Sequence, residues 1–285
     1  MIDAARYHKG IDPTDDSAHA RVLRAVGTAG RVLELGCGPG HMTEHLVAAG
    51  NDVTCVEVDP AAAAAARAVT PHVFVADLDM ADLAEVVGAE PFDTVVAADV
   101  LEHLRRPERT LRQAAELLRP GGTVVASIPN VAHVDVRLAL LAGRWDYKEH
   151  GLLDLTHLRF FTRSSALRLV ESVGLQVLDV QITTWAPFST NLGAAPTDVP
   201  GPVLDTVLAD PDATTLQFVI TARVPDGGLP PAPADPQAAA LCTPGVYGQF
   251  APAEPAAQAA DLASSEVSGA PRPSRSLFAR LRGRR

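Results

Sequence analysis

Residues 31–40 read RVLELGCGPG, and this stretch decides the fold. The apolar residues of its first half predict a buried strand that runs directly into a glycine-rich turn. Because Gly36, Gly38 and Gly40 have no side chain, a ligand can approach the backbone of the turn closely. The helix that follows presents free N–H groups above the end of the strand. The stretch therefore predicts a strand, a turn and a helix arranged around a ligand site.

Apolar runs of strand length alternate with segments of helical pattern along most of the chain. The expected strands are residues 31–35, 52–57, 72–76, 92–98, 123–128, 175–183 and 216–224. The expected helices are residues 14–26, 41–49, 60–68, 80–87, 107–118 and 163–173. This alternation predicts an α/β fold with a parallel sheet and right-handed crossovers, in which ligands bind beyond the carboxyl ends of the strands.

The composition excludes several classes of protein. A net charge of −10 over 285 residues argues against a broad nucleic-acid surface. The three cysteines, Cys37, Cys55 and Cys242, form no CxxC pair, which indicates a reducing, cytoplasmic setting. The chain has no run of 18 apolar residues, so we expect no membrane span.

We expect one folded domain over residues 1–224 and a tail over residues 225–285. The tail holds 10 of the 23 prolines and few large apolar residues, so it cannot bury enough surface to fold alone, and its end is basic. Within the domain, residues 131–162 are too long for a simple connection and contain a helical pattern over residues 134–141. We interpret them as an insertion at the ligand end of the sheet, on the side of the substrate, where it forms a lid or substrate pocket.

Acidic residues stand at the carboxyl ends of four of the expected strands. Glu57 comes 21 residues after the first glycine of the turn, where an acid is placed to accept hydrogen bonds from both hydroxyls of a ribose. Asp77 followed by Leu78 suits an adenine, while Glu34 and Asp99 offer negative charge to a cation. A site rich in glycine and acids, with GxGxG in place of GxGxxG, favours a positively charged nucleoside over a phosphate.

Five segments, in this order, resemble the class I S-adenosylmethionine-dependent methyltransferase family: VLELGCGPG, VEVDP, ADLDM, FDTVVAADVLEHL and LLRPGGTVVASIPN. Together they cover roughly residues 31–130. The resemblance implies a Rossmann-like, doubly wound sheet of seven strands in the order 3-2-1-4-5-7-6, with the last strand antiparallel. The lid expected from residues 131–162 follows the fifth strand. It implies S-adenosylmethionine as the cofactor.

The resemblance also implies which residues contact that cofactor. The three glycines of the turn pass its methionyl part, and Cys37 matches the family's small residue between them. Glu57 contacts the ribose, and Asp77 with Leu78 contacts the adenine.

The later half of the chain resembles narrower groups of methyltransferases. SIPNVAHVDVRLALLAGRWDY and LLDLTHLRFFT resemble bacterial methyltransferases of glycan, sugar or natural-product tailoring. DVLEH with a later HxRF also resembles the small-RNA terminal 2′-O-methyltransferases, where such residues hold a divalent metal. The metal set that this second resemblance implies is Asp99, Glu102, His103 and His157. We expect instead that Glu102 and His103 orient the loop after residues 92–98, and that no metal is bound.

Methyl transfer from a sulfonium is an in-line displacement, which requires aligned reactants and exclusion of water. A hydroxyl nucleophile also needs a base with a pKa near the working pH, and histidine fits this requirement best. We expect His157 to be that base, with Asp154 as its orienting partner. His133 is the second candidate and His150 the third, and all of them lie in or beside the insertion.

The sequence therefore predicts a methyltransferase that O-methylates a small molecule or a sugar unit of a glycan. Within the class, N- or C-methylation and metal-assisted 2′-O-methylation of RNA stay open, although the acidity of the chain argues against RNA. Outside the class, an NAD-type oxidoreductase is disfavoured by GxGxG, and an inactive cofactor-binding protein by the intact glycines and acids. The oligomeric state is left open.

Overall fold

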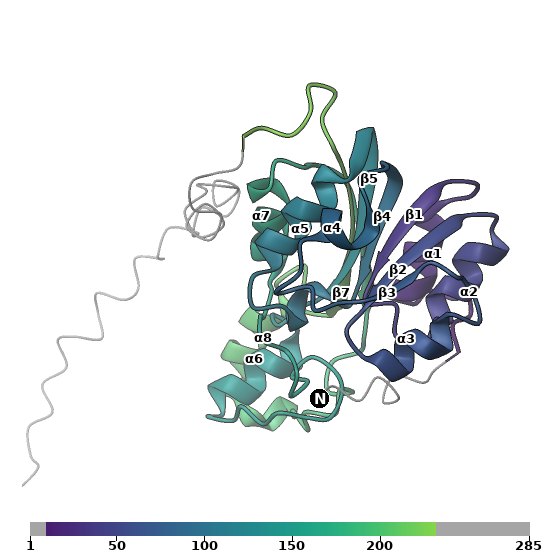
Figure 1. Cartoon of the computed structure of the whole chain (residues 1–285). Coiled ribbons are helices and arrows are strands. Elements are labelled where there is room, and N and C mark those ends of the chain that lie inside the picture. Colours follow the sequence, from purple (N-terminus) through teal and green to yellow (C-terminus); the bar gives the residue numbers. More distant parts are fainter. Residues whose placement is uncertain (1–9, 232–285) are drawn as a thin grey trace, which may run out of the picture. The chain divides into compact units, whose positions relative to one another are not determined.

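Seven strands form one sheet in the order β3-β2-β1-β4-β5-β7-β6 in the computed structural model, which describes residues 10–231 (Figure 1). The strands are β1 (Arg31–Leu35), β2 (Asp52–Glu57), β3 (Val73–Val75), β4 (Phe92–Ala98), β5 (Leu118–Pro129), β6 (Gln176–Thr184) and β7 (Thr215–Arg223). Strand β7 is antiparallel to both of its neighbours, and the other pairs are parallel. The predicted strand order and the antiparallel last strand are confirmed.

Helices cover both faces of the sheet and form two outer layers (Figure 1). The helices on one face are α1 (Ala18–Val26), α2 (His41–Ala48) and α3 (Pro60–Ala66). Those on the other face are α4 (Leu83–Val87), α5 (Pro107–Glu116) and α7 (Arg163–Ser172). Successive residues of β4 pack on opposite faces of the sheet: Val95 belongs to the core that includes α5, and Val96 to the core that includes α1. Because both faces are covered, the central strands are continuous apolar runs.

Local signals in the sequence determine several helix ends. Ser17 accepts a hydrogen bond from the first turn of α1, and Thr162 with Ser165 forms a capping box at the start of α7. Helix α1 begins at Ala18, later than the expected residue 14. The carboxylates of Asp12 and Asp15 accept hydrogen bonds from the N–H groups two residues further on, and this holds the preceding segment in turns.

Strand β5 begins earlier than expected. The sequence pattern predicts a helix up to residue 118, but α5 ends at Glu116 and Leu118 already pairs with Phe92. The pairing shifts before Thr123, and Gly122 fits this irregularity because a Cβ there would lie 2.9 Å from the carbonyl oxygen of Arg119. The strand therefore absorbs a segment that reads as a turn.

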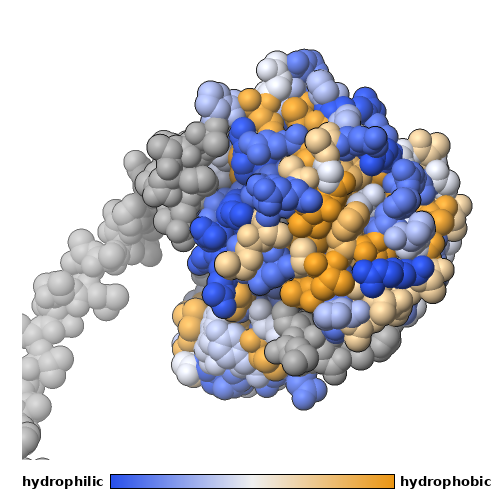
Figure 2. Space-filling model, in the orientation of Figure 1, coloured by the Kyte–Doolittle hydropathy of each residue, from blue (hydrophilic) through white to orange (hydrophobic). Residues whose placement is uncertain are grey.

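Strand β3 lies at the edge of the sheet and is not buried on both faces. Phe74 and Val75 are 38% and 45% exposed, because an edge strand has no neighbour on one side and less cover than the central strands. Figure 2 shows apolar residues gathered on the side of the molecule where β3 lies, and Val58 and Met80, beside the same edge, are also exposed. The exposed apolar surface adjoins the expected adenine position.

Two segments, residues 131–162 and 185–214, pack together beyond the carboxyl ends of the strands, and we call them the cap. The insertion contains the predicted helix α6 (Val134–Leu141), which contacts α8 (Gly201–Leu208), a helix that the sequence pattern does not predict. A small apolar core joins them, and Arg137 forms an ion pair with Asp210. In Figure 1, α6 and α8 lie together below the sheet. The second segment, expected to be a surface excursion, is therefore half of the cap.

The folded domain extends beyond the expected boundary at residue 224. Leu229 packs against the larger core, and a side chain at Gly174 would collide with Pro230. The remainder of the proposed tail, residues 232–285, lies outside the described residues, as does Cys242. Between residues 10 and 231, no helix is both long enough and apolar enough to cross a membrane.

Candidate active site

The glycine turn after β1 is held open by its backbone conformation. Gly36, Gly38 and Gly40 all have positive φ angles, of 66°, 54° and 100°. A Cβ at Gly36 would lie 2.8 Å from a methyl group of Val100, and a Cβ at Gly40 would lie 3.2 Å from Ala66. Among residues 10–231, no atom beyond the neighbouring residues of the turn lies within 4 Å of the Cβ position at Gly38, so these residues leave that side of the turn open. The turn therefore needs glycine for its shape and leaves its middle accessible to a ligand.

Glu57 joins the end of β2 to this turn. One carboxylate oxygen accepts a hydrogen bond from the N–H of Gly38 and the other from the N–H of Asp59, each at 2.8 Å. The side chain is buried, at 6% exposure. A carboxylate oxygen has more than one lone pair, so each oxygen retains capacity to accept from a ribose hydroxyl. The structure thus brings Glu57 and the glycine turn together, and their contact with a cofactor stays a prediction.

Asp77 and Leu78 follow β3 at the same end of the sheet. Asp77 is exposed, while Leu78 is buried and its carbonyl oxygen accepts a hydrogen bond from the hydroxyl of Thr110 in α5. Asp79 accepts hydrogen bonds from the N–H groups of Arg105 and Arg106. The loop is fixed by its neighbours, and it presents the exposed carboxylate of Asp77, whose Oδ1 accepts a hydrogen bond from the N–H of Asp79, beside an apolar side chain.

Glu34 and Cys37 are less accessible than the other expected cofactor residues. Glu34 is 3% exposed and accepts a hydrogen bond of 2.7 Å from the hydroxyl of Thr43 in α2. Burial raises the pKa of Glu34 to about 7. The neighbouring thiol of Cys55, together with burial, raises the pKa of Cys37 far above its ordinary value. The raised pKa disfavours the reactive thiolate form of Cys37, and Glu34 is buried against Thr43 of α2.

Asp99, at the end of β4, lies in a polar network that the sequence does not reveal. Its Oδ1 accepts hydrogen bonds from the Ser127 hydroxyl and the Gln217 amide, both at 2.7 Å. Its Oδ2 lies 3.4 Å from Nε2 of His19 in α1. Burial raises the pKa of Asp99, but the contacts with His19, Ser127 and Gln217 together hold the pKa below its ordinary value. A small polar residue inside the apolar run TVVASI is the one local signal for this network.

A second cluster contains three of the four residues in the alternative metal set. Ligand atoms of Glu102, His103 and His157 all lie within 4.8 Å of one another. Glu102 is 1% exposed, and neither carboxylate oxygen has a hydrogen-bond partner among residues 10–231. Burial, followed by the charge of Asp99, raises the pKa of Glu102 well above its ordinary value. Asp99 is not part of the cluster.

The expected bases and their partner have different surroundings. His133 is fully buried, caps α6 with Nδ1 and places Nε2 3.3 Å from the carbonyl oxygen of Trp185, so both ring nitrogens have partners and its role as a base stays a prediction. His157 is 8% exposed, and burial lowers its pKa. Asp154 accepts hydrogen bonds from the N–H and hydroxyl of Thr156, whose hydroxyl contacts His103. Asp154 thus holds the turn that carries His157, and Thr156 of that turn contacts His103.

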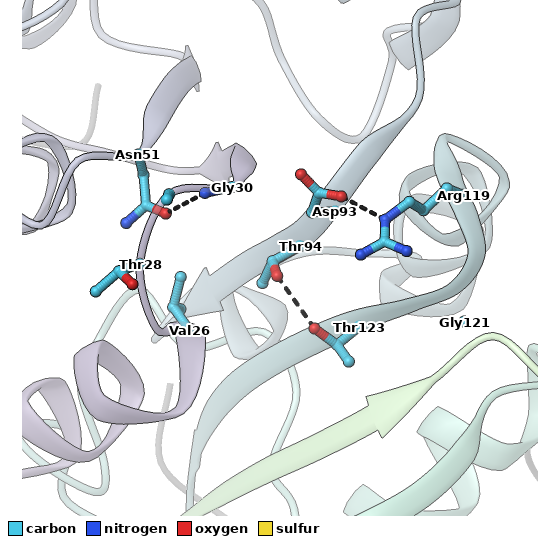
Figure 3. Close-up of a pocket in the computed structure, with 10 residues that line it drawn as sticks. Val26, Thr28, Gly30, Asn51, Asp93, Thr94, Arg119, Gly121 and Thr123 are labelled. Carbon is cyan, nitrogen blue, oxygen red and sulfur yellow. Dashed lines mark hydrogen bonds and ion pairs between the residues drawn. The ribbon is translucent and has the colours of Figure 1, made fainter.

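A separate cavity of about 270 Å³ opens at the amino ends of β1, β4 and β5, away from these residues (Figure 3). Its polar side chains bond to one another or to nearby backbone: Asn51 accepts from the N–H of Gly30, and Thr94 contacts Thr123 at 3.1 Å. In parallel sheets of this kind ligands bind at the carboxyl ends. The cavity therefore does not belong to the candidate active site.

Residues 14–180 match a family model described as "Methyltransferase domain". The chain belongs to this methyltransferase family. The match covers the glycine turn, the acids at the ends of β1 to β4 and the three-residue cluster. The chain is a class I S-adenosylmethionine-dependent methyltransferase, and S-adenosylmethionine is its cofactor. The family and cofactor predicted from the sequence motifs are confirmed.

Curated relatives and solved structures agree with this assignment. A "Ubiquinone biosynthesis O-methyltransferase" of Aromatoleum aromaticum is 31% identical over 175 residues, which are 58% of this chain and 73% of the relative. A protein of the same name from a Methylobacterium species is 30% identical over 197 residues, 68% of this chain and 75% of the relative. The fold is similar to an S-adenosylmethionine-dependent methyltransferase from Mesorhizobium loti, with a TM-score of 0.50, 22% identity, and coverage of 73% of this chain and 99% of the other.

Proposed function

We propose that this methyltransferase transfers the methyl group of S-adenosylmethionine to a hydroxyl oxygen of a small molecule or sugar unit. The observation that carries the proposal is the similarity to two relatives named O-methyltransferases, over about three quarters of their length. The cap supports the proposal. It has an apolar core of its own and lies beside the end of the sheet where the methyl group would lie, so it can form one wall of an acceptor pocket. The net charge of −10 disfavours RNA as the acceptor.

In the proposed reaction, this chain's residues hold the cofactor and align the acceptor. Glu57 accepts hydrogen bonds from the ribose, and the glycine turn lets the methionyl part lie against the backbone. Asp77 accepts from the adenine amine, with Leu78 against the ring. The cofactor supplies an electrophilic methyl group on a sulfonium. The protein aligns the acceptor oxygen with the carbon–sulfur bond and excludes water.

The experiment is a panel of acceptors with [methyl-13C]-S-adenosylmethionine and the full chain. The panel contains catechol, 3,4-dihydroxybenzoate, methyl glucoside, an amine and a short RNA. A 13C methyl signal at the chemical shift of an O-methyl group, on any of the hydroxyl compounds, is the expected result. Methyl transfer to the amine alone, or to RNA alone, contradicts O-methylation of a small molecule.

The three-residue cluster favours a second form of this function, in which a divalent metal assists O-methylation. Glu102, His103 and His157 fit such an ion, because Glu102 is buried with unpartnered carboxylate oxygens and the histidines offer imidazole nitrogens. When bound, the metal acts as a Lewis acid that lowers the pKa of a hydroxyl. This assignment makes His157 a ligand, whereas the sequence predicts a base.

Electron paramagnetic resonance with Mn²⁺ tests the metal separately from activity. We expect the full chain to bind Mn²⁺, and Glu102→Gln to weaken binding by at least about tenfold. Glu85→Gln, an exposed acid of α4, is the matched control and keeps the affinity of the parent chain. Equal Mn²⁺ affinity in the parent chain and Glu102→Gln removes the cluster as a metal site.

A further inference from the structure

A cleft of about 390 Å³ lies at the carboxyl end of the sheet, between the start of α1 and the adjoining ends of β6 and β7. Its lining residues are Asp15, Asp16, Ser17, Ala18, Thr183, Thr184, Trp185, Leu216 and Gln217. Trp185 is 49% exposed, so a large aromatic side chain is available to a ligand here. The cleft has the size of a small-molecule site and lies at the end of the sheet where the cofactor binds.

His19 adjoins this cleft and is oriented by a fixed carboxylate. It follows the lining residues Ser17 and Ala18 in the sequence, its side chain is 43% exposed, and its Nε2 faces Oδ2 of Asp99. Gln217 lines the cleft, and its side-chain amide donates a hydrogen bond to Asp99, so this residue connects the cleft with Asp99 and His19. Asp99 has a φ of 53°, an unusual conformation that sets the direction of its carboxylate.

The charges around His19 come from three elements. The hydrogen bond to Asp99 raises the pKa of His19 above its ordinary value, against an opposing effect of burial. Asp15, before α1, and Glu34, in β1, raise that pKa further. A raised pKa strengthens the imidazole as a base while keeping it near the range where it exchanges protons.

We propose that His19 is the general base of methyl transfer and that Asp99 is its positioning residue, with an uncharged hydroxylated ring entering through the cleft as the acceptor. The proposal rests on the proposed function. In the step, the hydroxyl proton passes to the His19 nitrogen that does not face Asp99. The oxygen forms a bond to the methyl carbon as the carbon–sulfur bond breaks, and the electron pair of the carbon–sulfur bond stays with sulfur. The products are the methyl ether, neutral S-adenosylhomocysteine and a protonated His19, which returns its proton to solvent.

The cleft favours an uncharged ring over an anionic one. Trp185 offers a flat aromatic face on which a ring can stack. Asp15 and Asp16 are both lining residues, and hydrogen bonds from Ser17 lower the pKa of Asp15, so it stays ionised. A carboxylated acceptor would be repelled by this charge.

The test measures methylation of catechol as a function of pH, together with the affinity for S-adenosylhomocysteine by calorimetry. We expect His19→Gln to lower kcat by about a hundredfold and to leave the cofactor affinity within about threefold. Asp99→Asn should lower kcat and move the acidic limb of the pH profile to lower pH by about one unit. Asparagine tolerates a positive φ, so this variant preserves the backbone. His72→Gln, an exposed histidine at the amino end of β3, is the control and behaves like the parent chain.

Two results would overturn the assignment of His19: a kcat for His19→Gln within threefold of the parent chain, or a parallel loss of cofactor affinity. An unmoved pH profile in Asp99→Asn would remove Asp99 as the positioning residue. A lower KM for 3,4-dihydroxybenzoate than for catechol, or no turnover of catechol and methyl glucoside, would overturn the acceptor class. The proposed function fails differently, by methyl transfer to an amine or RNA and to no hydroxyl compound.

Discussion

Replacing Glu57 by glutamine separates its observed contacts with the backbone of the turn from its proposed contact with the ribose. Its two oxygens each accept a backbone hydrogen bond of 2.8 Å, from Gly38 and from Asp59. A glutamine has one acceptor oxygen, so one of these N–H groups faces an amide donor. The glycine turn should lose about 1–2 kcal/mol of its contribution to the free energy of unfolding. The ribose should lose one charge-assisted hydrogen bond, worth about 2 kcal/mol, or about thirtyfold in Kd.

Calorimetry with S-adenosylhomocysteine measures the loss of affinity, and thermal unfolding without ligand measures the effect on the turn. Glu90→Gln is the matched control, because Glu90 is an exposed acid that pairs with Arg31 at the far end of the sheet. We expect Glu57→Gln to change both quantities and Glu90→Gln to leave the affinity unchanged. A Kd within threefold of the parent chain, together with lower stability, would show that Glu57 shapes the turn and does not contact the ribose.

Three other perturbations follow from the structure. The pKa of Glu34 is about 7 in the folded chain against an ordinary 4.5, so its protonated form favours folding below pH 4.5 and that stability is lost as the pH rises to about 7. Glu34→Gln should therefore raise the free energy of unfolding by up to about 3 kcal/mol at pH ~8 and by much less at pH ~4.5. An equal increase at the two pH values would contradict a raised pKa of the Glu34 carboxyl. Gly36→Ala should destabilise the chain by at least about 1 kcal/mol, measured by denaturant unfolding, because the added Cβ meets Val100 at a positive φ; an unchanged midpoint would contradict that contact. Removing residues 232–285 should leave the melting temperature unchanged. Removing residues 225–285 should lower the free energy of unfolding by about 1–2 kcal/mol, because the packing of Leu229 is lost. Equal stability of the two truncated chains would place the domain boundary at residue 224.

Much of the fold and the cofactor site follows from local sequence. The glycine turn, the apolar strands and the acids at their ends are short-range patterns, and parallel strands bring their ends together by topology alone. Glu57 and Asp77 are therefore found at the expected edge of the sheet. The family resemblance supplies the position of β7, which the local pattern does not give.

The residues that the sequence misses depend on contacts between distant segments. His19 meets Asp99 because α1 packs across the sheet, 80 residues before the acid in the chain. The cap forms because α6 and α8 bury apolar faces against each other, and neither face is visible without its partner. His133 looks like a candidate base in the sequence, but the packing of the cap buries it completely.

A crystal structure of the full chain with S-adenosylhomocysteine would locate the cofactor site. We expect ribose hydroxyls within hydrogen-bond distance of Glu57, the adenine beside Asp77 and Leu78, and the methionyl part along Gly38. A nucleoside bound elsewhere, for example in the cavity at the amino ends of the strands, with the glycine turn unoccupied, would contradict this expectation.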